Sequence, residues 1–162
     1  MRLLFTSVLL LCATLSVSAG SIQILSRDSL SPLSYEVTQN GATETPFDNP
    51  YWDSHQPWIY VDIIDGTPLF SSIDKYDSGT WWPTFSRPIR KGSLLYLDDG
   101  SLWEDRTEVK ARRSWSHLWH LFSDGPSQYN GVRYCMNSAA LRFVPLADMR
   151  KAWYIGYLRL FK

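Results

Sequence analysis

The distribution of proline constrains the fold of this chain more than any other sequence feature. Proline lacks a backbone N–H and breaks helices from within, so closely spaced prolines leave room only for short elements. The 162 residues contain nine prolines, which are Pro32, Pro46, Pro50, Pro57, Pro68, Pro83, Pro88, Pro126 and Pro145. We therefore expect short strands and turns rather than long helices.

The segments between the prolines carry strand and turn signals. Residues 107–112 alternate in polarity, and Asp65-Gly66 is a typical turn pair. One short helix is expected at residues 33–38, after Ser31-Pro32. The remaining pattern predicts a mainly β domain of antiparallel strands. The expected pairs are 59–64 with 68–72, 93–97 with 107–112 across the turn Asp98-Asp99-Gly100, and 118–122 with 132–137, followed by a strand at 140–144.

Composition supports a single folded domain and argues against nucleic acid as a partner. Apolar residues make up 44% of the chain, which is enough to form a packed core. The 16 basic and 16 acidic side chains give a formal net charge of zero. No cationic excess is therefore available to neutralise phosphates along a nucleic acid.

The first 19 residues have the features of a secretory signal peptide. Arg2 precedes an apolar run that ends at the small-residue site Val17-Ser18-Ala19. We expect residues 1–19 to direct export to an extracellular, periplasmic or cell-envelope location, and residues 20–162 to form the domain. Retention of the segment as a membrane anchor is the alternative. Loss of Cys12 would leave Cys135 as the only thiol, with no internal disulfide and no thiolate zinc site.

Cys135 stands in a context that favours chemistry over a purely structural role. Arg133 and Asn137 share the face of Cys135 in a strand, and a nearby guanidinium stabilises a thiolate. Without that context, the usual interpretation of a lone cysteine is a small buried apolar residue. His117 and His120 would lie on opposite faces of a strand unless a bulge intervenes. Together these side chains supply a nucleophile, an activating charge and groups that can move a proton.

A metal site is the weaker alternative for the two histidines. Asp124 is the nearby carboxylate that could join them, but the sequence offers no further ligand close by.

A series of ordered segments matches one known family across the domain. They are 46–53, 68–72, 75–80, 82–85, 106–109, 116–118, 124–126 and 133–143, the last beginning Arg133-Tyr134-Cys135-Met136-Asn137. From about residue 30 to residue 161 the chain resembles the B-type peptide methionine sulfoxide reductases, which act on the R epimer of methionine sulfoxide. The resemblance implies two antiparallel sheets around the active site, with short N-terminal helical segments.

The resemblance also implies roles for individual residues. Cys135 would attack the sulfoxide sulfur, release methionine and become a sulfenic acid. Arg133 would lower the pKa of that thiol. His117, His120 and Asn137 would orient water and protonate the sulfoxide oxygen. Asp124 would support one imidazole. Trp82 and Phe122 would bind substrate.

Two departures from the family pattern bear on recycling and metal binding. Many members have a resolving cysteine where this chain has Thr80. The sulfenic acid would then be reduced directly by an external thiol, such as a thioredoxin-like protein, with the enzyme acting as a monomer on oxidised proteins or peptides. Zinc-bearing members have two Cys-x-x-Cys pairs where this chain has residues 62–65 and 111–114. We expect no zinc, and we expect Asp62 and Asp65 to be solvated turn carboxylates.

Tryptophan is the compositional outlier, with eight residues. Trp58, Trp81, Trp103, Trp119 and Trp153 stand where the family usually has glycine. One hypothesis is that UGA codons, which some bacteria read as glycine, were translated as tryptophan. The alternative is genuine aromatic substitution around a divergent site. A competing hypothesis for the function is a catalytically impaired relative that binds oxidised methionine segments, because Trp81 or Trp119 could fill the pocket or displace a catalytic side chain.

Overall fold

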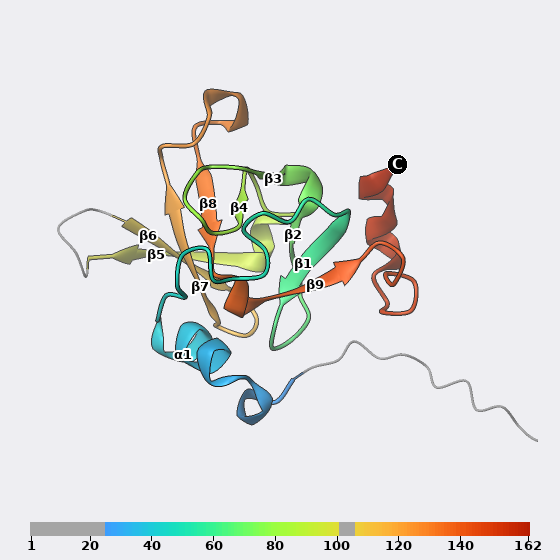
Figure 1. Ribbon diagram of the computed structural model, residues 1–162, viewed down its shortest axis with the longest axis horizontal. Coiled ribbons are helices and arrows are strands. Elements are labelled where there is room, and N and C mark those ends of the chain that lie inside the picture. Colours follow the sequence, from blue (N-terminus) through green and yellow to red (C-terminus); the bar gives the residue numbers. More distant parts are fainter. Residues whose placement is uncertain (1–24, 101–105) are drawn as a thin grey trace, which may run out of the picture.

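Two antiparallel sheets form the body of the protein, as expected from the sequence (Figure 1). The computed structural model describes residues 25–100 and 106–162. The smaller sheet has the order β2 (Pro68–Ser71), β1 (Trp58–Asp62) and β9 (Leu141–Pro145). The larger has the order β3 (Lys75–Tyr76), β4 (Thr84–Phe85), β8 (Arg133–Met136), β7 (His117–Phe122), β6 (Arg106–Ala111) and β5 (Leu94–Asp99).

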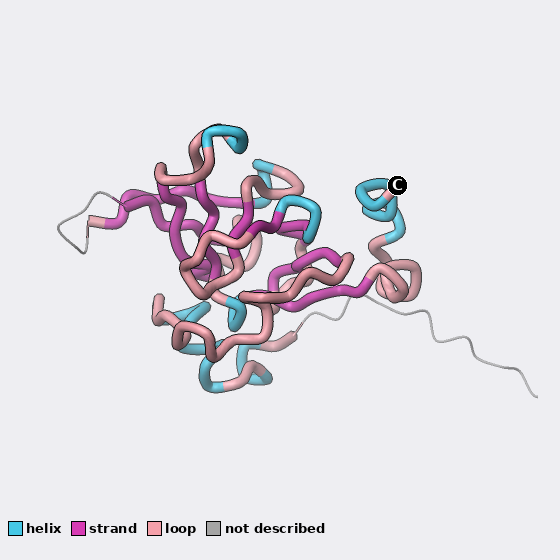
Figure 2. The backbone as a smooth tube through the Cα atoms, turned by 45° about the horizontal axis from the view of Figure 1, so that its top comes forward, coloured by secondary structure: helices cyan, strands magenta, loops and turns pink. Residues whose placement is uncertain are grey.

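The expected helix is present as α1 (Pro32–Asn40). Ser31 caps it by accepting a hydrogen bond from the Ser34 N–H, and Gly41 ends it with a φ of 72°. Short 3-10 turns lie at the periphery of the strands (Figure 2). They are η1 (Arg27–Ser29), η2 (Ser72–Asp74), η3 (Lys91–Ser93), η4 (Ser127–Tyr129), η5 (Ser138–Ala140) and η6 (Ile155–Phe161).

The expected strand pairs form, with differences at their ends. β1 stops at Asp62 because the Asp62 carboxylate accepts hydrogen bonds from the backbone N–H groups of Ile64 and Asp65, which turns the chain. Asp98 and Asp99 belong to β5 and pair with β6, so the prediction that they form a turn was wrong. β3 and β4 were not predicted, since two residues are too few to show a periodicity.

The core lies between the two sheets and is rich in aromatic rings. Phe70 of β2 stacks on Phe85 of β4, with ring centroids 4.5 Å apart. A second apolar cluster joins β1 and β9 to the C-terminal segment through Ile59, Val144 and Tyr154. The C-terminal segment therefore packs beside the smaller sheet, as the red end of the chain shows in Figure 1.

Six described non-glycine residues have a positive φ, and four of them are tryptophans. Trp81, Trp115, Trp119 and Trp153 have φ values of 69°, 63°, 145° and 65°. The other two are Phe47 and Asn130. The positive φ supports the glycine hypothesis at Trp81, Trp119 and Trp153, and it adds Trp115.

The proposed signal peptide and Trp103 lie outside the described residues. Within residues 25–100 and 106–162, no helix has the length and apolar character needed to cross a bilayer.

Candidate active site

β8 places Cys135 deep in the larger sheet. Cys135 is 1% exposed. Its Sγ lies 3.6 Å from Thr80 Oγ1 and 4.0 Å from Thr84 Oγ1. Burial raises the pKa of the Cys135 thiol, while the Thr80 hydroxyl and the Arg133 charge act in the opposite direction. Formation of the thiolate therefore depends on these two neighbours.

Three hydroxyl groups beside the thiol form a chain. Ser78 Oγ lies 2.7 Å from Thr80 Oγ1 and 2.8 Å from Thr84 Oγ1. Sequence reasoning did not assign Ser78 or Thr84 a role, because hydroxyl residues in a loop or in a strand of two residues carry no distinctive spacing. Because these hydroxyls are hydrogen-bonded to one another, Ser78 orients the Thr80 and Thr84 hydroxyls that contact the Cys135 sulfur.

Arg133 is held beside Cys135 by a carboxylate and an aromatic ring. Its Nε and Nη2 donate to Asp124 Oδ1 and Oδ2 at 2.7 and 2.8 Å. Its guanidinium carbon lies 4.1 Å from the centroid of the Phe122 ring. The hydrogen bonds from Arg133 lower the pKa of Asp124. The expected role of Asp124 is corrected, since it orients the guanidinium and not an imidazole, and Phe122 supports the same guanidinium.

A bulge brings the two histidines to the same side of β7. The register between β6 and β7 shifts at Val109 and Lys110, so that Leu118 is an extra residue on β7. The rings of His117 and His120 consequently lie 5.9 Å apart. His120 also pairs directly with Cys135 across the β7–β8 ladder. The bulge that the spacing of three residues requires is therefore present.

Each imidazole is oriented by a carboxylate of the same sheet: Glu108 lies on β6, next to β7, and Asp99 lies on β5, one strand further away. His117 Nδ1 lies 2.6 Å from Glu108 Oε1, and His120 Nε2 lies 2.7 Å from Asp99 Oδ2. Arg106 also donates to Asp99 Oδ2, at 2.9 Å. Sequence reasoning missed both carboxylates. The pairing of residues 107–112 with the next strand was the signal that could have located Glu108.

The second nitrogen of each ring is left for a reacting group. His117 Nε2 and His120 Nδ1 are buried and have no hydrogen-bond partner among the described residues. Burial lowers the pKa of His120, and the Asp99 carboxylate opposes this shift. Burial therefore favours the neutral form of His120, with one nitrogen facing Asp99 and the other able to take up a proton.

Asn137 makes structural hydrogen bonds that the sequence did not predict. Its Oδ1 accepts from the Glu44 N–H at 3.0 Å, and its Nδ2 donates to the Leu118 carbonyl at 3.2 Å. The Asn137 backbone N–H donates to the same carbonyl at 2.8 Å. Through these three hydrogen bonds, Asn137 fixes the bulge between the histidines.

Glu44 connects the segment after α1 to the end of β8. Its carboxylate accepts hydrogen bonds from the Ser138 and Ala139 N–H groups at 2.5 and 2.7 Å. Its carbonyl accepts from Trp82 Nε1 at 3.2 Å. Burial raises the pKa of Glu44 to about 7. Sequence reasoning also missed this residue, whose partners lie far away in the chain.

Trp82 and Trp119 make an aromatic wall near the histidines. Their ring centroids are 4.3 Å apart in an edge-to-face arrangement. Trp119 lines a cavity of about 430 Å³ together with His117 and His120, and Glu108 contributes to the same wall. The ring of Trp119 thus occupies space beside the two imidazoles.

The two segments that correspond to the zinc-binding pairs are joined by hydrogen bonds. Asp62 is fully buried and accepts from the Ser114 Oγ at 2.9 Å, and Asp65 is buried as well, so the expectation of solvated carboxylates was wrong for both residues. Asp65 Oδ1 accepts from the Thr67 N–H at 2.8 Å. No thiol or imidazole is present in these segments, and zinc prefers such ligands. The described residues contain no cluster of three or more His, Cys, Asp or Glu that could hold a metal ion.

Comparison with known proteins agrees with this geometry. Residues 30–145 match the SelR domain. A peptide methionine sulfoxide reductase MsrA/MsrB of Vibrio cholerae serotype O1 is 54% identical over 136 residues, a match that covers 84% of this chain and 36% of that relative. The chain thus spans only about a third of the length of the curated relative. Since the matched domain covers most of the chain, the chain belongs to the SelR family, that of the B-type peptide methionine sulfoxide reductases.

Proposed function

We propose that this protein reduces peptide-bound methionine-R-sulfoxide to methionine, with Cys135 as the nucleophile. The observation that carries the proposal is the environment of one thiol. Cys135 pairs with His120 across the ladder, Arg133 supplies a positive charge, and each imidazole keeps one unpaired buried nitrogen. A nucleophile, a charge that stabilises the thiolate and two proton-handling groups meet the needs of sulfoxide reduction.

The reaction balances with these groups. The unpaired ring nitrogen of His117 or His120 takes the thiol proton of Cys135 and passes it to the sulfoxide oxygen, while the Cys135 sulfur forms a bond to the sulfoxide sulfur. The oxygen then passes to the Cys135 sulfur as the bond between the two sulfurs breaks, which releases methionine and leaves a sulfenic acid. The substrate sulfur gains two electrons and the cysteine sulfur loses two.

Recycling requires two electrons from outside the chain. Thr80 lies beside the thiol and cannot form a disulfide with it. Two equivalents of an external thiol would convert the sulfenic acid to the thiol, producing water and one disulfide. We propose a thioredoxin-like donor, a monomeric enzyme, and export of the domain after removal of residues 1–19.

An activity assay tests the proposal. The full chain is incubated with peptides that carry the R or the S epimer of methionine sulfoxide, with dithiothreitol as reductant. We expect reduction of the R epimer only, and no turnover by Cys135→Ser, which keeps the volume of the side chain but has a far weaker nucleophile. In a single turnover without reductant, dimedone should label Cys135. Retention of activity by Cys135→Ser would refute the mechanism.

A binding module that has lost catalysis is the second candidate. It is favoured by Trp119, whose ring fills space beside the imidazoles and contacts Trp82. Tight binding of the oxidised peptide without turnover, in a folded protein, would support this candidate over the enzyme.

A further inference from the structure

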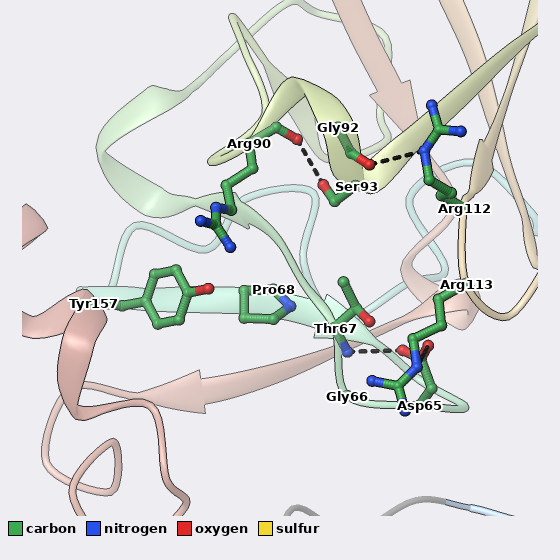
Figure 3. Close-up of a pocket in the computed structure, with 10 residues that line it drawn as sticks. All are labelled: Asp65, Gly66, Thr67, Pro68, Arg90, Gly92, Ser93, Arg112, Arg113 and Tyr157. Atoms are coloured by element: carbon green, nitrogen blue, oxygen red, sulfur yellow. Dashed lines mark hydrogen bonds and ion pairs between the residues drawn. The ribbon is translucent and has the colours of Figure 1, made fainter.

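A cavity away from Cys135 collects three arginines. It measures about 530 Å³ and lies between the β1–β2 turn, the segment before β5, the β6–β7 turn and η6 (Figure 3). Arg90 comes from one wall and Arg112 and Arg113 from another, while Tyr157 of η6 contributes an aromatic surface. A volume of this size is typical of sites for small molecules.

Two of the three guanidinium charges are not neutralised by a carboxylate in the described chain. Arg112 donates from Nε to the Gly92 carbonyl at 2.8 Å and from Nη2 to the Leu94 carbonyl at 3.1 Å, so its group is held in place by neutral acceptors. The Arg90 side chain has no hydrogen bond or ion pair within the described residues. The walls are therefore strongly positive in a chain whose net charge is zero.

The third arginine already has an acidic partner. Arg113 Nε lies 3.6 Å from Asp65 Oδ2, and the other Asp65 oxygen accepts from the Thr67 N–H. Asp65, the single carboxylate among the cavity's lining residues, is thus paired with Arg113, and the positive charges of Arg90 and Arg112 remain without a carboxylate partner.

We propose that this cavity binds a small phosphate monoester. A guanidinium matches phosphate oxygens in charge and in the direction of its N–H groups. Two uncompensated positive charges suit the charge of about −2 on a phosphate group better than the single charge of a carboxylate. Tyr157 and Pro68 supply an apolar surface for the organic part of the ligand.

Binding of glycerol phosphate and inorganic phosphate to the full chain tests this proposal. Titrations followed by NMR at low salt should show saturable binding of glycerol phosphate, with inorganic phosphate weaker. Arg90→Gln should reduce the affinity about tenfold, and the fold should be kept because the Arg90 side chain is exposed and makes no hydrogen bond or ion pair within the described residues. Arg159→Gln, an exposed charge of η6 outside the cavity, is the matched control. Equal affinity in Arg90→Gln and the wild type, no saturable binding, or binding of an acidic peptide alone would overturn the proposal.

A second inference rests on an independent observation, the backbone at four tryptophans. The left-handed region costs an L-residue about 1–2 kcal/mol, and a bulky side chain is rare there. Trp81, Trp115 and Trp153 are 45%, 60% and 58% exposed, so full burial of their rings does not offset this cost. Glycine adopts the same φ without the penalty.

We infer that positions 81, 115, 119 and 153 are glycine in the protein that the cell makes. A single cause accounts for one residue type at all four places, namely UGA codons read as glycine by the cell and rendered as tryptophan in this sequence. Trp58 gives no such argument from its backbone, since its φ is not positive and its ring is buried among Tyr51, Tyr60 and Phe143.

Glycine at position 119 would change the candidate active site. The Trp119 ring contacts Trp82 and lines the cavity beside His117 and His120. Without that ring, the space between Trp82 and the two imidazoles opens to a substrate. The inference itself does not depend on the proposed function, because it rests on backbone conformation.

Gene sequencing together with mass spectrometry of the native protein decides this inference. We expect UGA codons at the four positions and native peptides with the mass of glycine there. UGG codons would overturn it, and so would UGA codons with tryptophan in the native peptides. Trp82, whose φ is not positive, is the internal control and should be encoded by UGG.

Discussion

Replacement of Trp153 by glycine and by alanine isolates the energetic effect of its backbone conformation. Both variants remove the same ring, which is 58% exposed, so the loss of apolar contact is shared. The two differ only in the Cβ atom of alanine, which must sit at a φ of 65°. Trp115, with a φ of 63° and 60% exposure, provides a second instance of the same experiment.

The expected difference follows from two opposing effects. Relief of the left-handed conformation favours glycine by about 1–2 kcal/mol. The greater freedom of glycine in the unfolded chain disfavours it by about 0.5–1 kcal/mol. Glycine should therefore be more stable than alanine by about 0.5–1 kcal/mol at each position, or about 1–4 °C in Tm for a domain of this size.

Urea denaturation of the paired variants, followed by circular dichroism, measures this difference. Ile73, which is exposed and has no positive φ, is the matched control, and there alanine should be more stable than glycine. The reversal of sign between Trp153 and Ile73 is the decisive observation. Alanine equal to or better than glycine at both Trp115 and Trp153 would refute the argument from backbone strain.

Three further predictions concern the site. Thr80→Cys should form an intramolecular disulfide with Cys135 after one turnover, because the two side chains are 3.6 Å apart, and thiol titration would detect it; two persistent free thiols would contradict this. Glu108→Gln should lower kcat roughly 10–100-fold with little change in KM and should shift the pH–rate profile, since the carboxylate orients His117; an unchanged profile would assign Glu108 a purely structural role. The pKa of Glu44 is raised from 4.5 to about 7, so the fold is stabilised by about 3 kcal/mol below pH 4.5, and this stability is lost as the pH rises through about 7. Glu44→Gln should flatten the dependence of the unfolding free energy on pH in this range. The same pH dependence in Glu44→Gln and in the wild type would contradict the raised pKa.

Sequence reasoning located the elements that depend on local pattern. The helix after Ser31 was found from its cap, and the strands around Asp65-Gly66 from the turn. Cys135 was selected as the candidate nucleophile because Arg133 lies two residues away, and the structure places both residues in one strand. All of these signals lie within a few neighbouring residues.

The contacts that position the site were less visible, because they join distant parts of the chain. Asp99 reaches His120 only after β5, β6 and β7 have paired, and no spacing along the sequence indicates it. Asp124 lies nine residues from Arg133 and was assigned to an imidazole, although it binds the guanidinium. The path of the loop between β7 and β8 places Asp124 beside the guanidinium and not beside an imidazole, and the sequence does not reveal that path.

The extra residue in β7 makes the candidate site sensitive to chain length as well as to residue type. His117 and His120 share one side only because Leu118 adds a residue to the strand, and Asn137 binds the Leu118 carbonyl through both its backbone and its side chain. A deletion of one residue here would return the ladder to regular alternation and turn one imidazole toward the opposite face. Among homologous proteins, insertions and deletions should thus be excluded between these two histidines even where substitutions are accepted. Directed evolution that only exchanges side chains would leave this part of the catalytic geometry intact, whereas a library that varies loop and strand length would lose it at once.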